Sequence, residues 1–220
     1  MMTIRTLTTR SSGFTASIFT RSVYLHAGPR IEGLKRDPNA AFVNPKGIKY
    51  GLTESNIAPV KTFLGQEYAI PDEVILQVIT HKSFGNGIKP HNEKLMVMGS
   101  KLLTLFFVKH VTNPECKDES RAINGKNLDV LGGQVSRGLA SVETAGIFAQ
   151  ASKLNEVMFW KSSNSKLGFH SSGERKVSGQ MLSGLVGAVN FYHGKDKAEK
   201  FISEKLVDAF EKISFKYLLE

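Results

Sequence analysis

Cysteine is almost absent from this 220-residue sequence, in which Cys116 is the single example. One thiol excludes an intramolecular disulfide framework and a cysteine-rich zinc site. It is also consistent with a reduced compartment such as the mitochondrial matrix or the cytosol. Cys116 lies near Pro114 with no sequence context that favours a nucleophile, so we interpret it as an inert thiol in a loop.

Long apolar runs are missing too. A membrane span needs about 18 consecutive apolar residues, whereas the longest candidate here, Leu102 to Val108, has the length of a segment in a core helix. Hydrophobic residues still make up 41% of the chain. This content, without low-complexity tracts, predicts one globular domain with a short extension and no membrane partner.

Acidic residues are scarce: 20 Asp and Glu against 29 Lys and Arg give a formal net charge of +9. The first acid is Glu32, and the segment before it holds many Ser and Thr and four arginines, Arg5, Arg10, Arg21 and Arg30. This composition is typical of a mitochondrial transit peptide, which we place at residues 1–30. The alternative is a basic tail that binds RNA directly. The remaining chain is still basic, which favours a polyanionic partner, most simply RNA.

Residues 31–65 show little hydrophobic periodicity. They contain several Gly and Asn and three prolines, Pro38, Pro45 and Pro59. We therefore predict an irregular extension here rather than part of a domain.

The remainder of the chain predicts an all-α fold, because apolar residues recur at three- and four-residue steps. A first helix begins at Pro71 and ends near Phe84. Two short helices between Leu128 and Lys153 divide near Ser141, and one amphipathic helix from Ala198 to Ile213 closes the domain. The polar segment 161–176 is expected to be a solvated loop.

Two sequence elements lie between Thr80 and Ser100: Thr-His-Lys-Ser, and Asn-Glu-Lys-Leu-Met-Val-Met-Gly-Ser from Asn92 onwards. The second resembles the signature helix of ribonuclease III, Asn-Glu-x-Leu-Glu-x-x-Gly-Asp. Asn92, Glu93, Leu95 and Gly99 match this pattern, whereas Met96 stands at the second glutamate and Ser100 at the aspartate.

Two further segments resemble the same family in the correct order. Leu139 to Ala149 is similar to its Leu-Val-Ser-x-Glu-Thr-Leu-Ala segment, and Ser178 to Asn190 is similar to its Ala-Asp-x-x-Glu-Ala-Leu-Ile-Gly-Ala segment. In the latter, Gln180 replaces the aspartate and Ser183 the glutamate. The resemblance implies a ribonuclease III-like helical domain over residues 66–215 that forms dimers.

In that family the carboxylates of both helices hold magnesium, a cation that prefers oxygen ligands. At about 100° per residue, positions 93, 96 and 100 share one helix face. Here Met96, Ser100, Gln180 and Ser183 carry no negative charge, and Glu93 alone remains, at a position that is auxiliary in the family. We therefore expect no catalytic residues, no metal and no cofactor: a pseudoenzyme.

The resemblance also implies two surfaces. Family domains pair through their signature helices, which makes Leu95, Met98 and Leu102 candidate dimer-interface residues. Basic side chains in and after the polar loop are candidates for RNA binding: Lys161, Lys166, Arg175, Lys176, Lys195, Lys197 and Lys200. A solvated face without RNA is the alternative for these cations. The sequence ends at Glu220, so we expect no double-stranded-RNA-binding domain.

Within the family, this combination is similar to the ribonuclease III-like proteins of the fungal mitochondrial large ribosomal subunit. That similarity implies a structural component in the mitochondrial matrix, bound to mitochondrial ribosomal RNA and to a second ribonuclease III-like protein as a heterodimer. One alternative is a mitochondrial double-stranded RNA endoribonuclease or RNA-processing cofactor that uses Glu93 and borrows acids from a partner. A non-ribosomal adaptor in RNA turnover is another.

Overall fold

The structure is a computed structural model that describes residues 42–219 except 45, 117–119, 121 and 163–166. The chain separates into two units, Met1–Arg36 and Asp37–Glu220, and the described residues all belong to the second. The expected transit peptide, residues 1–30, and the first part of the expected extension lie outside the described residues.

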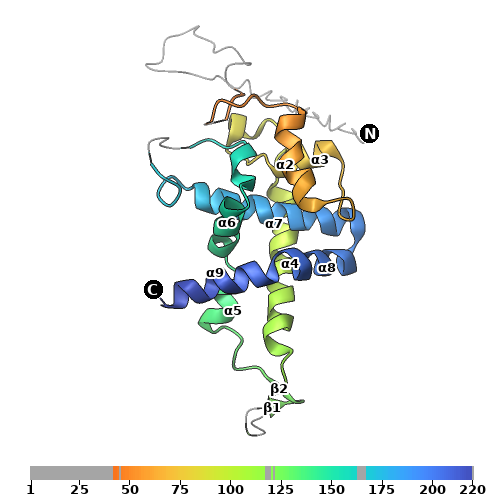
Figure 1. The fold of residues 1–220 in the computed structure, drawn as a ribbon, viewed down its shortest axis with the longest axis vertical. Coiled ribbons are helices and arrows are strands. Elements are labelled where there is room, and N and C mark those ends of the chain that lie inside the picture. The colour runs from red at the N-terminus through yellow and green to blue at the C-terminus, as the bar shows by residue number, and fades with distance from the viewer. Residues whose placement is uncertain (1–41, 45, 117–119, 121, 163–166, 220) are drawn as a thin grey trace, which may run out of the picture. The chain divides into compact units, whose positions relative to one another are not determined.

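The described part is mostly helical, which confirms the all-α expectation (Figure 1). A short antiparallel hairpin and two 3₁₀ turns, Phe84–Gly87 and Leu154–Val157, interrupt the helices. The elements follow in this order: α2 (Glu54–Leu64), α3 (Asp72–Val78), α4 (Glu93–Thr112), β1 (Ala122–Ile123), β2 (Lys126–Asn127), α5 (Gln134–Leu139), α6 (Val142–Ala151), α7 (Glu174–His193), α8 (Lys195–Lys205) and α9 (Val207–Leu219).

Helix α7 is the central element and crosses α4 at close range (Figure 1). A β-carbon added to Gly99 of α4 would meet the backbone oxygen of Ser183, and one added to Gly187 of α7 would meet that of Leu95. The two backbones therefore touch at these glycines. This approach explains why both predicted motif segments carry Gly at the crossing, and it fixes the face that each helix turns to the other.

One prediction was wrong: residues 54–64 are not irregular but form helix α2. Ile57, Val60 and Leu64 of this helix are buried in the core. Pro59 inside it lacks an N–H, a defect that costs about 3 kcal/mol in a helix interior. Burying three large apolar side chains contributes roughly 1.5–3 kcal/mol each, so packing outweighs the proline.

The closing helix also differs from the prediction, because it is divided into α8 and α9 at Leu206. Leu206 has φ −117° and ψ −34° and is fully buried. After this break, α9 packs against α5 and α6, whereas α8 packs against α7. The redirection lets the apolar side chains of the two helices cover different parts of the core.

Candidate functional site

The signature segment begins with a scaffold residue, Asn92. Its side chain, 1% exposed, donates to the carbonyl oxygen of Val78 at 3.0 Å, and its main-chain N–H donates to the Thr80 oxygen at 3.0 Å. These bonds tie the start of α4 to the end of α3. The matching half of the motif therefore keeps its structural role and aims the next turn of α4 at α7.

Helices α4 and α7 bring the expected ligand positions to neighbouring faces. Met96 and Ser100 are half-buried on α4. The backbone N of Met96 lies 3.8 Å from the position that a β-carbon on Gly184 of α7 would take. The hydroxyl of Ser100 donates to its own helix, to the Val97 oxygen at 3.0 Å. Ser183, buried on α7, donates in the same way to the Gly179 oxygen at 3.0 Å. Both hydroxyls are thus satisfied by their own helices.

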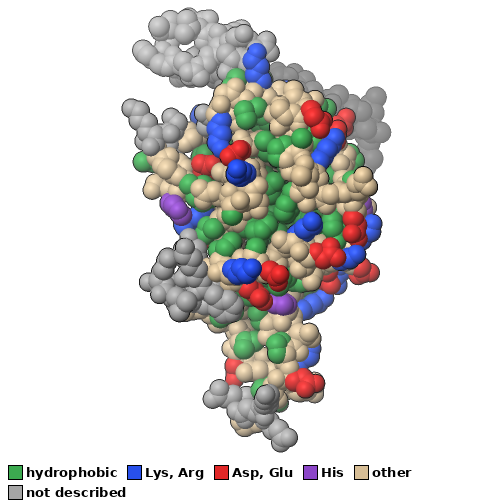
Figure 2. Space-filling view, in the orientation of Figure 1, with side chains coloured by type: hydrophobic (Ala, Val, Ile, Leu, Met, Phe, Trp, Pro, Cys, Tyr) green, Lys and Arg blue, Asp and Glu red, His purple; other side chains and the backbone are tan. Residues whose placement is uncertain are grey.

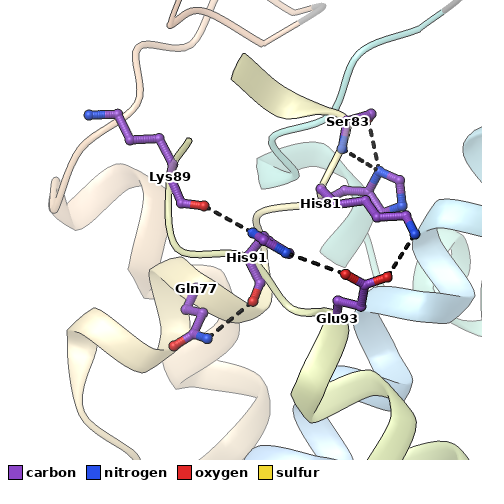
Figure 3. A network of polar contacts seen from close by, with 7 residues as sticks. Gln77, His81, Ser83, Lys89, His91 and Glu93 are labelled. Carbon is purple, nitrogen blue, oxygen red and sulfur yellow. Dashed lines mark hydrogen bonds and ion pairs between the residues drawn. The ribbon is translucent and has the colours of Figure 1, made fainter. Parts of the chain in front are cut away.

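Glu93 is the one carboxylate at these positions, and two basic side chains flank it (Figure 3). The Lys82 Nζ atom lies 2.7 Å from Glu93 Oε1, and His91 Nε2 lies 3.5 Å from Oε2. The hydrogen bond from Lys82 is the main cause that lowers the pKa of Glu93. The carboxylate is therefore ionised and already has a cation beside it.

His81 borders the same site. Its Nδ1 accepts a hydrogen bond from the Ser83 N–H at 3.2 Å and lies 2.8 Å from the Ser83 hydroxyl, which itself accepts from the Lys161 N–H at 3.0 Å. An accepting Nδ1 places the ring proton on Nε2, in the neutral imidazole. Burial lowers the pKa of His81, and a hydrogen bond with Gln180 opposes this shift. Gln180, at the position of the family's aspartate, thus lies near His81.

The donors present do not fit a pair of magnesium ions. Such ions need several oxygen ligands in octahedral array, and here one carboxylate stands beside a lysine and a thioether, two hydroxyls and an amide. Over the described residues, no three His, Cys, Asp or Glu side chains are grouped so that they could hold a metal ion. These side chains therefore do not fit a resident metal ion.

The candidate interface residues of α4 lie largely toward the core of this chain. Leu102 is 8% exposed and belongs to the core of this chain, and Leu95 is partly buried against the same core. Met98 is half-buried at the edge. The exposed apolar side chains of α4 are instead Val97 and Leu105.

Helix α4 also has a composition that would suit a membrane span. By length and composition, it is the one helix within the described ranges that could cross a membrane, and 22% of its apolar window is buried. Its buried residues, which include Gly99 and Leu103, pack inside the domain. We therefore interpret α4 as a core helix with an uncovered second face.

The candidate RNA-binding residues do not form one patch. Lys166 lies outside the described residues. Arg175 and Lys176 are on the first turn of α7 rather than in a loop, whereas Lys195 lies two residues past the last residue of that 20-residue helix and begins α8. At 1.5 Å per residue these two groups are about 30 Å apart along the axis.

Several of these cations are paired with acids. Arg175 contacts Glu143 at 2.9 Å, Lys195 contacts Glu199 at 3.7 Å, and Lys200 contacts Glu67 at 2.9 Å. Figure 2 shows basic and acidic side chains interspersed over the region where α8 lies in Figure 1. Lys161 and Lys176 are exposed, and both adjoin the site: the main-chain N–H of Lys161 donates to the Ser83 hydroxyl, and Lys176 lies one turn before Gln180.

Sequence reasoning missed Lys82 and His91 as partners of Glu93. Lys82 precedes Glu93 by eleven residues, and a tight turn with positive φ at Gly85, Asn86 and Gly87 brings them together. Three small turn residues in a row were a signal that the chain reverses there. The pairing itself has no local sequence pattern.

Comparisons with known proteins agree with this geometry. A sequence model of the ribonuclease-III-like family matches residues 71–210, well over half of the chain. Two solved structures of the nuclease domain of ribonuclease III from Campylobacter jejuni have the same fold. One, which concerns structural flexibility in a region involved in dimer formation, is 15% identical with a TM-score of 0.50 and is matched over 97% of its length by 73% of this chain. The other is 18% identical with a TM-score of 0.51, over 95% of its length and 71% of this chain. The chain belongs to the ribonuclease III-like family.

Proposed function

We propose that this protein is a non-hydrolytic, structural member of its family: a component of the mitochondrial large ribosomal subunit that pairs with another ribonuclease III-like domain and contacts ribosomal RNA. The observation that carries the proposal is the donor set at the α4–α7 crossing. Met96, Ser100, Gln180 and Ser183 are neutral, and the remaining Glu93 is paired with Lys82.

The electrostatics of the site disfavour metal-dependent hydrolysis. Metal ions in hydrolytic sites polarise the phosphodiester, activate water and stabilise the leaving oxygen, and they bind where several carboxylates converge. In this protein the local charge of Glu93 is offset by Lys82 at 2.7 Å. A divalent cation would therefore have to displace an ammonium group and would gain one carboxylate.

The composition of the chain supports a mitochondrial location and an RNA partner. The acid-free, arginine-containing start of the chain is typical of a transit peptide. The net charge of +9 favours association with a polyanion. The family dimer adds a reason to expect a partner domain, because α4 leaves an apolar face uncovered.

Co-sedimentation tests the proposal. An epitope-tagged copy of the full chain is expressed in the organism that naturally makes the protein. A mitochondrial extract of these cells is then separated on a sucrose gradient. We expect the tagged protein in the large-subunit fractions, and we expect EDTA-induced subunit dissociation to leave it with the large subunit. Recovery only in light fractions would overturn the assignment.

A nuclease assay tests the alternative activity. The purified protein, with any co-purifying partner, is incubated with double-stranded RNA and magnesium. We expect no cleavage above the level of a Glu93→Gln variant. Magnesium-dependent cleavage that is lost in Glu93→Gln would instead establish an endoribonuclease.

A further inference from the structure

The outward face of α4 carries an ordered pattern of lysines and apolar residues. At about 100° per residue, six positions fall within an arc of about 100°. Five of them are exposed and the last is half-buried: Lys94, Val97, Lys101, Thr104, Leu105 and Val108. We call these six residues the outer face of α4. Val97 is 51% exposed and Leu105 is 45% exposed.

The outer face is not needed for the core of this chain. Gly99, Leu102, Leu103 and Phe107, on the opposite side of α4, already provide its buried contacts. A surface helix normally has one apolar stripe, whereas α4 has apolar residues on both faces. Val97 and Leu105 are therefore exposed apolar surface that the core of this chain does not use and that is available for docking.

A lipid bilayer does not fit as the occupant. A membrane-spanning helix must be able to meet lipid or other spanning helices, but the inner face of α4 touches the α7 backbone at Gly99. Lys94 and Lys101 also lie within the outer face itself, where a charge is expensive in hydrocarbon. Because apolar Val97 and Leu105 alternate with the two lysines, the occupant that fits this face is a protein surface rather than a lipid or a phosphate backbone.

The charges of the outer face discriminate between partners. Glu93 is the single acid of α4, and its carboxylate is held by Lys82 of the same chain. In a symmetric pair, the same patch of each subunit meets its copy. If two copies of the outer face met, Lys94 and Lys101 of one copy would lie close to Lys94 and Lys101 of the other. Neither α4 helix offers a free acid that could lie between these lysines.

A different partner can convert this repulsion into attraction. Lys94 and Lys101 are seven residues apart, about 10.5 Å along the helix. A helix that presents carboxylates at a similar seven-residue spacing, with apolar residues between them, would pair with both lysines and cover Val97 and Leu105. Like-charge contacts against the wrong partner and opposite-charge contacts with the right one together set specificity.

We propose that the outer face of α4 selects an unlike partner: a protein helix with an apolar stripe and carboxylates opposite Lys94 and Lys101, in preference to a second copy of this chain. This inference deepens the pairing part of the proposed function and rests on it. Lys94 and Lys101 act as specificity-determining residues, and Val97 and Leu105 supply the apolar contact.

A charge-swap experiment tests the inference with this chain alone. The variant Lys94→Glu/Lys101→Glu supplies an outer face of opposite sign, and analytical ultracentrifugation measures self-association and mixed association with the unaltered protein. We expect each protein to be monomeric alone at micromolar concentration. We expect the mixture to associate at least tenfold more tightly than either protein by itself.

Two controls make the result specific. Lys46→Glu/Lys49→Glu makes the same charge change at two exposed lysines outside α4 and should not promote mixed association. Adding Val97→Ser and Leu105→Ser to the charge-swapped variant should abolish it. A stable dimer of the unaltered chain, a mixture that stays monomeric, or equal association of the Lys46/Lys49 variant would overturn the inference.

A gradient experiment separates this inference from the proposed function. If the unaltered protein sediments with the large subunit, we expect Lys94→Glu/Lys101→Glu to reduce its share in those fractions more than tenfold, with an unchanged thermal unfolding midpoint. Equal sedimentation of the variant would refute a role for the outer face while leaving the ribosomal assignment intact. Absence of both proteins from the large subunit would refute that assignment instead.

Discussion

For single residues at the candidate site, the negative charge of Glu93 is balanced by the positive charge of Lys82. Glu93 lies beside Lys82 and His91, and Figure 3 shows the His91 contact. Gln180 lies near His81. The Lys82–Glu93 pair is exposed, and such pairs contribute little to stability, with a median of about 0–1 kcal/mol. Its consequence is therefore local: it removes the negative potential that would attract a divalent cation.

His81 offers a measurable probe of this pocket. Its pKa lies below the ordinary value of 6.5 because burial favours the neutral imidazole. Between that ordinary value and the lowered one, the unfolded chain binds more protons than the folded protein. The contribution of His81 to stability is therefore fully present above pH 6.5 and is lost as the pH falls below it.

Substituting Gln180→Asp tests the contact between the two helices at this point. A carboxylate beside the ring stabilises the imidazolium form, so we expect the pKa of His81 to rise in the variant. The Cε1 proton of His81, followed by NMR across a pH titration, reports this shift. Gln150→Asp, at an exposed position of α6, is the matched control and should leave His81 unchanged. An unaltered His81 titration in Gln180→Asp would contradict the predicted contact.

At the scale of elements, the α4–α7 crossing depends on the absence of side chains at two glycines. We expect Gly99→Ala to lower the free energy of unfolding by at least about 2–3 kcal/mol, at the upper end of ordinary overpacking. The reason is that the new methyl group would meet the Ser183 oxygen, which is backbone and cannot rotate away. Urea unfolding followed by circular dichroism measures the change.

Gly51→Ala is the control for this prediction, because a β-carbon there has no atom within 4 Å. It should change the free energy of unfolding by less than about 0.5 kcal/mol, as surface substitutions usually do. If both variants unfold alike, the close approach of α4 and α7 is not a source of stability.

The elements that sequence predicted well are those whose pattern is local. The two motif helices, and the division near Ser141 between α5 and α6, follow from spacing and from the N-cap of Ser141, whose side chain accepts from the Thr144 N–H. Helix α2 was not predicted because a proline such as Pro59 usually ends a helix. The burial of the apolar side chains of α2 against distant parts of the chain offsets that cost, and this burial is not visible in the local sequence. No Gly or Pro marks the break at Leu206 in the sequence. The break arises because α8 packs against α7 whereas α9 packs against α5 and α6.

The candidate site divides in the same way. The positions of Glu93, Met96 and Ser100 follow from helix geometry, and their proximity to Ser183 follows from the crossing at Gly99. The side of α4 that stays exposed could not be predicted, because apolar residues occupy both faces and only packing decides which is covered. The grouping of the lysines was equally hidden, because it depends on where the ends of α7 lie.

Across the whole molecule, some of the excess basic side chains are paired with carboxylates and others are not. Around α8, ion pairs with Glu67 and Glu199 offset Lys200 and Lys195. Beside the α4–α7 site, Lys161 and Lys176 are exposed, and among the described residues neither is paired with a carboxylate. The proposed RNA contact is therefore expected near the α4–α7 site rather than along α8.

This difference predicts unequal effects on RNA binding. Lys161→Ala/Lys176→Ala should weaken binding to a fragment of mitochondrial large-subunit ribosomal RNA and should reduce the slope of log K against log salt by about 1–2, since each lost phosphate contact removes about 0.7–0.9. Lys195→Ala/Lys200→Ala removes the same formal charge but should change the slope by less than half as much, because carboxylates already accompany these ammonium groups. Filter binding at several salt concentrations measures both variants. Equal slopes for the two pairs would show that RNA contact follows total charge rather than the unpaired cations beside the site.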